Sequence, residues 1–126
     1  MTEKIRLVQG DTRPQIRFSL TDDTTGNVID ISDSTVLMKF RALGDTTILF
    51  TRVGVLLSGI VTESGSVNTD PPYNLPGSGG LVVFTFGVGN LDIDPGPYEA
   101  ELEVTFSDGD IQTVYQLQKF IVRADF

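Results

Sequence analysis

The segment from Asp94 to Ile121, DPGPYEAELEVTFSDGDIQTVYQLQKFI, decides the fold of this chain. Between Tyr98 and Phe106 its residues alternate without a fault, with an apolar side chain at nearly every second position. The positions between them hold Glu99, Glu101, Glu103 and Thr105. A period of two is typical of a β-strand with one buried face and one face in water. The segment therefore predicts a strand over 98–106.

The dipeptide Asp108-Gly109 follows this strand and predicts a tight hairpin, because both residues tolerate the positive φ angles of a type I′ turn. A two-residue turn here sets the register, so that Ser107 pairs with Asp110 and Phe106 pairs with Ile111. The odd-numbered residues of the returning strand then lie beside the apolar face. The side chains expected to be buried are those of Tyr98, Leu102, Val104, Phe106, Tyr115 and Leu117.

The apolar pattern changes phase after Leu117, where Phe120, Val122 and Ala124 fall on even numbers. A slip of one residue sends a side chain to the opposite face of a sheet. We therefore expect a β-bulge or sharp bend near Gln118-Lys119.

The rest of the chain contains further short strands separated by Gly, Pro, Asp and Asn. Ile16, Phe18 and Leu20 alternate with polar residues, and so do the apolar residues of 36–40. The dense apolar segment 53–61 predicts one or two buried strands, whereas 62–80 holds almost nothing that could join a sheet. No helical stripe is present. The sequence predicts a single all-β domain over 1–126, an antiparallel sandwich of about seven to nine strands with one long loop at about 62–80.

Composition removes several classes of chemistry. The chain has no Cys and no His, which excludes disulfides, thiolate metal sites, a cysteine nucleophile and the commonest general base. The net charge is −8, which disfavours nucleic acid as a partner. No segment has the length of a membrane span or the apolar core of a signal peptide, so we expect a protein made in a cytoplasm without membrane association.

The residues that lead into the predicted strand resemble a motif of immunoglobulin-like domains, the tyrosine corner. Asp94, Gly96 and Tyr98 occupy its positions, and Ala100 stands where antibody domains have a cysteine. In that motif the buried tyrosine hydroxyl bonds back to the chain just upstream.

A wider resemblance covers most of the chain apart from 62–80. Its motifs are QGDT at 9–12, GNVIDIS at 26–32, the apolar strand at 36–40, GPYEAE at 96–101 and FSDG at 106–109. Together they resemble the N-terminal Ig-like domain of tailed-phage baseplate upper proteins and related small Ig-like virion proteins. The resemblance implies a non-catalytic structural role in the virion, as a baseplate, tail or fibre-attachment adaptor that contacts other virion proteins and forms homo- or hetero-oligomers. Head decoration remains an alternative, as does a carbohydrate-binding or adhesion sandwich.

Carboxylates are the only candidates for chemistry. Glu99, Glu101 and Glu103 share one strand face, and we expect that face to be solvated without a cleft. Pairs of aspartates at 92 and 94 and at 108 and 110 could supply calcium ligands, but Asp is common at such turns. We therefore expect no catalytic residue, no metal and no cofactor.

The long loop contains the one candidate for partner binding, Pro71, Pro72, Tyr73, Asn74, Leu75 and Pro76. Three prolines favour an extended conformation around two apolar side chains that have no evident place in the core. A stiff segment of this kind loses little entropy on docking. The Gly and Ser residues on either side are expected to let the segment move until it is docked. The alternative is a loop that only covers the surface or is disordered.

Overall fold

The computed structural model describes residues 4–22, 24–114 and 117–126. Over these residues the protein is all-β and contains no helix, as predicted. Eleven strands are present in this part of the chain, more than the seven to nine expected, because several have only two or three residues. The strands are β1 (Ile5–Val8), β2 (Gln15–Ser19), β3 (Thr35–Ala42), β4 (Phe50–Val53), β5 (Val55–Leu56), β6 (Ile60–Val61), β7 (Val67–Asn68), β8 (Leu81–Thr85), β9 (Gly96–Thr105), β10 (Ile111–Thr113) and β11 (Gln118–Arg123).

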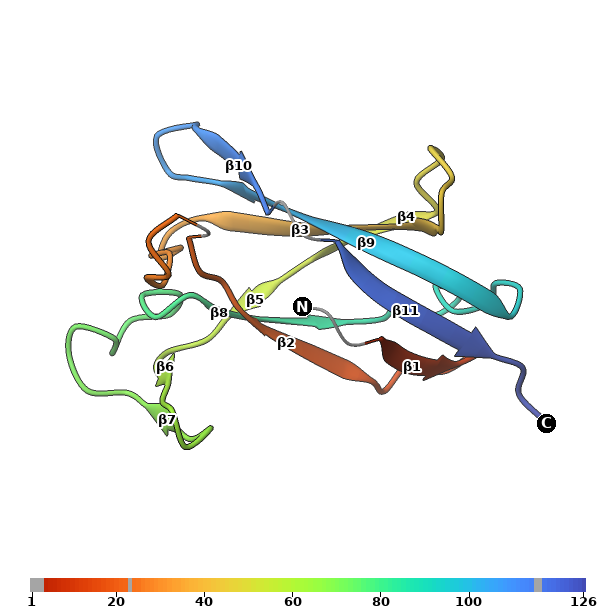
Figure 1. Ribbon diagram of the computed structural model, residues 1–126, viewed down its shortest axis with the longest axis horizontal. Helices are drawn as coiled ribbons and strands as arrows, with labels where there is room; N and C mark the ends of the chain where they lie inside the picture. Colours follow the sequence, from red (N-terminus) through yellow and green to blue (C-terminus); the bar gives the residue numbers. More distant parts are fainter. Residues whose placement is uncertain (1–3, 23, 115–116) are drawn as a thin grey trace.

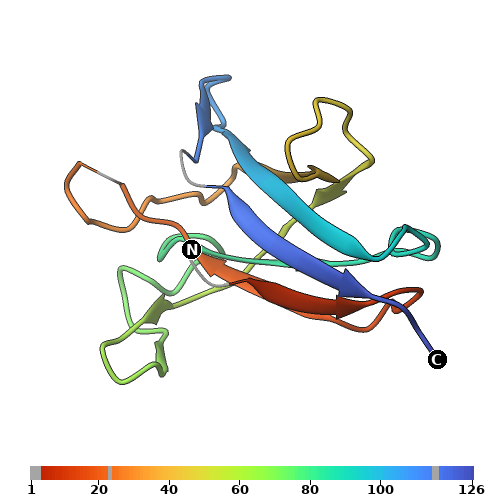
Figure 2. The ribbon, with the colours of Figure 1, turned by 45° about the vertical axis from the view of Figure 1, so that its right-hand side comes forward.

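The larger sheet has the strand order β1-β11-β9-β3-β4, and β10 also pairs with β9 (Figure 1). Its centre is the long antiparallel pair of β3 and β9, in register from Thr35 opposite Thr105 to Ala42 opposite Tyr98. The outermost pair differs, because β1 runs parallel to β11. Figure 2 shows β11 lying between β9 and β1.

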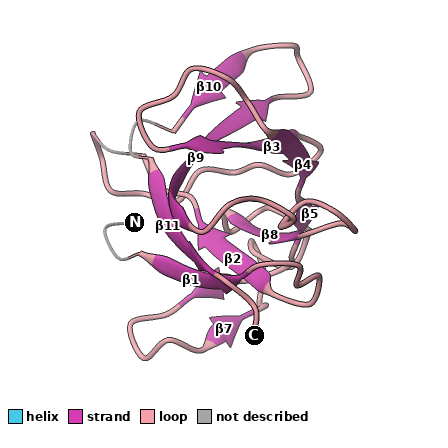
Figure 3. Cartoon of the chain, turned by 90° about the vertical axis from the view of Figure 1, so that its right-hand side faces the viewer, coloured by secondary structure: helices cyan, strands magenta, loops and turns pink. Residues whose placement is uncertain are grey.

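The second sheet, in the order β2-β8-β5, forms the other layer of the molecule (Figure 3). A two-stranded ladder of β6 and β7 stands at one end. One hydrophobic core fills the space between the layers and draws residues from both sheets. The alternation predicted for Ile16, Phe18 and Leu20 is confirmed, since all three are buried while Arg17 and Ser19 are exposed.

Phe40 is the centre of an aromatic cluster in this core. Its ring centroid lies 4.6 Å from that of Phe50, 4.9 Å from that of Phe120 and 5.3 Å from that of Tyr98. Aromatic pairs at such separations contribute to stability beyond the area they bury. The cluster joins β3, β4, β9 and β11 behind one face of the larger sheet.

Gly54 is the point at which the chain crosses from one sheet to the other. The segment before it pairs with β3, and the segment after it pairs with β8. A Cβ atom at position 54 would lie 2.4 Å from a methyl carbon of Val82. Only glycine fits this crossing, because the backbone passes directly over a core side chain.

The register predicted for the hairpin is wrong by one residue. Ile111 pairs with Thr105, and the N–H of Phe106 donates to the carbonyl of Asp110 at 2.8 Å. Gly109 has φ +93° but Asp108 has no positive φ, so the connection has three residues and a single left-handed glycine instead of a type I′ pair. The shift moves Ile111 to the glutamate side of the sheet, where it is 64% exposed.

The β-bulge or bend predicted near Gln118-Lys119 does not lie at those two residues. Those two residues pair regularly with Ala100 and Glu99 inside β11. The discontinuity lies earlier, because the five steps from Thr113 to Gln118 correspond to only three steps on β9. Two extra residues preserve the parity of the faces, so the even-numbered residues of β10 and β11 lie on the same side of the sheet as Val104 and Ala100, although Gln112 in β10 is exposed. The apparent change of phase arose from the incorrect register of the turn.

The burial predicted for the hairpin is partly confirmed. Tyr98, Leu102 and Val104 are buried, whereas Phe106 and Leu117 are only half-buried. Tyr115 lies outside the described residues.

Candidate interaction surfaces

The turn before β9 contains the hydrogen bond expected of a tyrosine corner. The hydroxyl of Tyr98 donates to the carbonyl oxygen of Asp94 at 2.5 Å. Between them Gly96 has φ +149°, a conformation that L side chains rarely adopt. Burial, and then the charge of Asp94, raise the pKa of the Tyr98 hydroxyl, so it remains a donor. At the other end of the strand, the Asp108 carboxylate accepts the N–H of Asp110 at 2.9 Å and closes the turn around Gly109.

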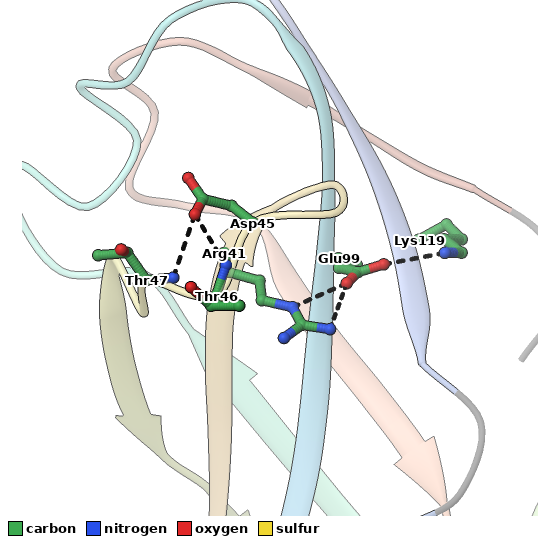
Figure 4. Close-up of polar contacts among 6 residues, drawn as sticks. All are labelled: Arg41, Asp45, Thr46, Thr47, Glu99 and Lys119. Atoms are coloured by element: carbon green, nitrogen blue, oxygen red, sulfur yellow. Dashed lines mark hydrogen bonds and ion pairs between the residues drawn. The ribbon is translucent and has the colours of Figure 1, made fainter.

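The outer face of the larger sheet carries an ionic cluster at Glu99 (Figure 4). Glu99 projects from β9 between side chains of β3 and β11. One carboxylate oxygen accepts a hydrogen bond from Nε of Arg41 at 2.7 Å, and the other accepts one from Nζ of Lys119 at 3.0 Å. The residue is only 4% exposed. The prediction of a fully solvated glutamate face is therefore wrong at this position, because neighbouring strands supply two cations that cover the carboxylate.

Lys119 and Arg41 also favour the ionised form of Glu99. Burial by itself raises the pKa of Glu99, but hydrogen bonds from Lys119 and Arg41, with their charges, bring the pKa below its ordinary value of 4.5. Farther along the same face, Nζ of Lys39 lies 2.8 Å from Glu103, and this hydrogen bond raises the lysine pKa. These contacts neutralise charge on a sheet surface, and the cations beside Glu99 favour the ionised form of that carboxylate.

The aspartates considered as calcium ligands do not come together. Within the described residues no three acidic side chains are grouped so that they could hold a metal ion. Asp92 and Asp94 are exposed beside the corner, and Asp108 and Asp110 are exposed at the tip of the β9–β10 hairpin. Their positions are those of turn residues.

The segment 62–80 is more ordered than its composition predicts. Val67 and Asn68 form β7 and pair with β6, so the expectation that almost nothing in this segment could join a sheet fails at these two residues. The backbone of Gly77 bonds to both Leu57 and Ile31, and the carbonyl of Gly80 accepts the N–H of Leu20. All four residues of 77–80 are buried. The glycines of 77–80 allow close approach of neighbouring backbone. The expectation that the residues flanking 71–76 let this segment move is therefore contradicted for 77–80.

Gly79 shows how close this approach is. A Cβ atom at this position would lie 2.0 Å from the carbonyl oxygen of Gly59. Ser78 beside it is buried, and its hydroxyl donates to the carbonyl of Leu75 at 2.7 Å. The segment is thus clamped against the connection between β5 and β6.

The predicted partner-binding residues lie on the surface of this clamped segment. The N–H of Tyr73 donates to the carbonyl of Asp70 and closes a turn, in which the bond between Pro71 and Pro72 is cis. This turn contradicts the extended conformation expected from three prolines. Tyr73 is half-buried and its carbonyl accepts the N–H of Gly59, whereas Leu75 is 58% exposed. Pro71, Pro72, Asn74 and Pro76 are also exposed.

A second apolar surface was missed by sequence reasoning. The prediction of buried strands over 53–61 is wrong for Val53 and Val55, which are 63% and 61% exposed. Ile48 and Leu49, just before β4, are 48% and 45% exposed. We refer to these four residues as the β4 ridge. Alternation of apolar and polar residues would have identified the outward face. In 48–55 both faces carry apolar side chains, so the sequence pattern does not distinguish them.

Comparison with known proteins adds no relative. No family model matches the chain, and no curated protein or solved structure matches it significantly. Over the residues that the structure describes, no helix has both the length and the apolar character needed to cross a bilayer.

Proposed function

We propose that this chain is a non-catalytic structural module of a phage virion, with an Ig-like fold, that joins tail, baseplate or fibre components through protein–protein contacts. The proposal follows the resemblance of the turn and strand motifs to the Ig-like domain of baseplate upper proteins. Its partners would be other virion proteins, and its location would be the virion.

The strand order is the observation that carries the proposal. In immunoglobulin variable-type domains the neighbours G, F, C and C′ form one sheet, which faces the sheet containing B, E and D. Here β11, β9, β3 and β4 follow the first order, and β2, β8 and β5 follow the second. The Tyr98 hydrogen bond falls at the start of the strand that corresponds to F. This agreement supports an Ig-like sandwich and, with the motif resemblance, a virion module.

The surface features favour contact with proteins. Leu75 stands exposed on a clamped segment, and the β4 ridge exposes four further apolar side chains within 48–55. Apolar residues gathered on the surface of a folded domain are typical of interaction sites. We propose that residues 71–76 form one such contact.

The test is to purify phage particles from the source culture through a density gradient and to search their proteins for this chain by mass spectrometry. We expect the chain to co-purify with particles at a constant ratio to the major tail protein. Its absence from intact particles would refute the proposal. Labelling with gold-conjugated antibody then locates the chain, and a signal on capsids alone would favour head decoration over a tail adaptor.

A further inference from the structure

Strand β1 forms an open edge of the larger sheet. Among the described strands it pairs only with β11, and the N–H of Gln9 donates to the carbonyl of Arg123 at 2.9 Å. In a parallel pair with this register, the odd-numbered residues of β1 direct their backbone groups at β11. The N–H and carbonyl of Arg6 and the N–H of Val8 therefore point to the open side. Such an edge is a template for another strand.

The outer face beside this edge is hollowed and apolar at its base. A shallow depression of about 220 Å³ is lined by Arg6, Leu7, Val8, Ile121 and Arg123. Arg6 stands opposite Ile121, and Val8 stands opposite Arg123. Each apolar side chain thus has an arginine beside it across the strands. Ile121 is 39% exposed.

Neither arginine has a carboxylate partner within the part of the chain that the structure describes. The ion pairs among the described residues involve Lys39, Arg41 and Lys119 as cations, and none involves Arg6 or Arg123. The guanidinium of Arg123 donates to the carbonyl of Ala124 and lies 5.2 Å from the ring centroid of Phe126. In a chain of net charge −8, this face therefore presents two positive charges that form no ion pair with any described carboxylate.

We propose that β1 is a docking strand, to which an extended acidic segment of a partner protein adds by backbone hydrogen bonds. Its carboxylates pair with Arg6 and Arg123, and an apolar side chain between them covers Val8 and Ile121. Strand addition gives affinity through the main chain and specificity through alternate side chains. Binding of an acidic segment at β1 specifies the chemistry of one partner, and it rests on the proposed role of the chain in virion assembly.

Charge complementarity selects this partner over a second copy of the chain. Symmetric pairing of two β1 strands would place the Arg6 side chains on neighbouring strands of one face, where like charges repel. A charged residue on an edge strand also discourages pairing with apolar or basic strands. An incoming segment must therefore supply carboxylates.

Binding can be measured with a fluorescein-labelled peptide of about ten residues in which Glu and Val alternate. Fluorescence anisotropy should show saturable binding to the wild-type protein. We expect Arg6→Gln and Arg123→Gln each to weaken binding about three- to fivefold, because each removes one exposed ion pair. Arg17→Gln is the matched control, since it removes the same charge from an exposed position on the other sheet. It should change the affinity less than about twofold. Equal losses in all three variants, or no saturable binding, would overturn the proposal.

Amide exchange distinguishes an added strand from a loose electrostatic contact. On peptide binding, exchange of the Arg6 amide should slow at least about tenfold, whereas the Leu7 amide, already directed at β11, should change little. Bound peptide without protection of Arg6 would refute strand addition. The particle experiment answers a separate question, because a chain absent from virions can still bind the peptide at β1, and a virion component can still fail to bind it.

Discussion

The hydroxyl of Tyr98 and the carbonyl oxygen of Asp94 are joined by a hydrogen bond across the turn that opens β9. This bond fixes the entry of the strand that pairs with β3, β10 and β11. Removal of the hydroxyl leaves the carbonyl without that donor while the ring remains in the core.

Tyr98→Phe should therefore lower the free energy of unfolding by about 1 kcal/mol, the typical contribution of one hydrogen bond. Chemical denaturation measures this loss. Tyr73→Phe is the control, because Tyr73 is half-buried and its hydroxyl makes no hydrogen bond to the described residues. Equal stability of Tyr98→Phe and wild type would mean that the Asp94 bond contributes nothing.

Glu99→Gln should destabilise the protein at pH 7 by roughly 1–2 kcal/mol, a value reduced by solvent screening because Arg41 and Lys119 are partly exposed. The pKa of Glu99 is lowered in the folded state, so its contribution is present above the ordinary value of 4.5. The contribution disappears as pH falls through the folded-state pKa. The difference from wild type should shrink when denaturation is repeated in steps from about pH 7 to about pH 2.

Glu101→Gln is the control for this pH dependence, because Glu101 makes no ion pair with any described residue. It should show a smaller difference from wild type at every pH. A pH-independent loss in Glu99→Gln would point to packing instead of charge.

Gly79→Ala should destabilise the fold by about 2–3 kcal/mol, because the new methyl group would meet the carbonyl of Gly59 and force the backbone apart. Thermal and chemical unfolding both measure this effect. Gly87→Ala is the matched control, since the atoms nearest to its Cβ are side-chain atoms of Arg52 and Asn90, at 3.1 and 3.3 Å, and not backbone. If the two variants were equally stable, the segment 77–80 would not be clamped in solution.

Leu75→Ser should leave stability within about 0.5 kcal/mol of wild type, because the side chain is largely exposed. It should nevertheless reduce incorporation into particles if residues 71–76 form a contact. Val88→Ser changes a side chain that is 95% exposed elsewhere on the surface and serves as the control. Normal incorporation of Leu75→Ser would remove Leu75 from the proposed interface.

Alternation in the sequence was sufficient to predict the long strands. The inward residues of β2, β3 and β9 follow a period of two. Because each of these strands has one buried face, only the apolar set of alternate residues can face the core. Turn chemistry was less informative. Asp108-Gly109 suits both a two-residue and a three-residue connection, and these differ by one residue in register. Only the pairing with β9 decides between them.

The surfaces were harder to predict for a physical reason. The carboxylate of Glu99 is covered by the side chains of Arg41 and Lys119. These residues are distant from Glu99 in the sequence, and the strand order of the sheet brings them beside it. Gly77 and Gly79 were interpreted as flexible because composition does not distinguish a mobile glycine from one that admits a neighbouring backbone. The partner chemistry of residues 71–76 stays a prediction.

The crossing at Gly54 has a consequence for how the molecule comes apart. Segment 50–56 is hydrogen-bonded to both layers, and segment 5–19 likewise passes from β11 to β8. These two stretches of covalent chain therefore connect the two sheets. Neither sheet can shift or separate while the other keeps its strand pairing. Such coupling favours cooperative loss of both layers in a single transition, without a stable half-molecule in which one sheet remains folded.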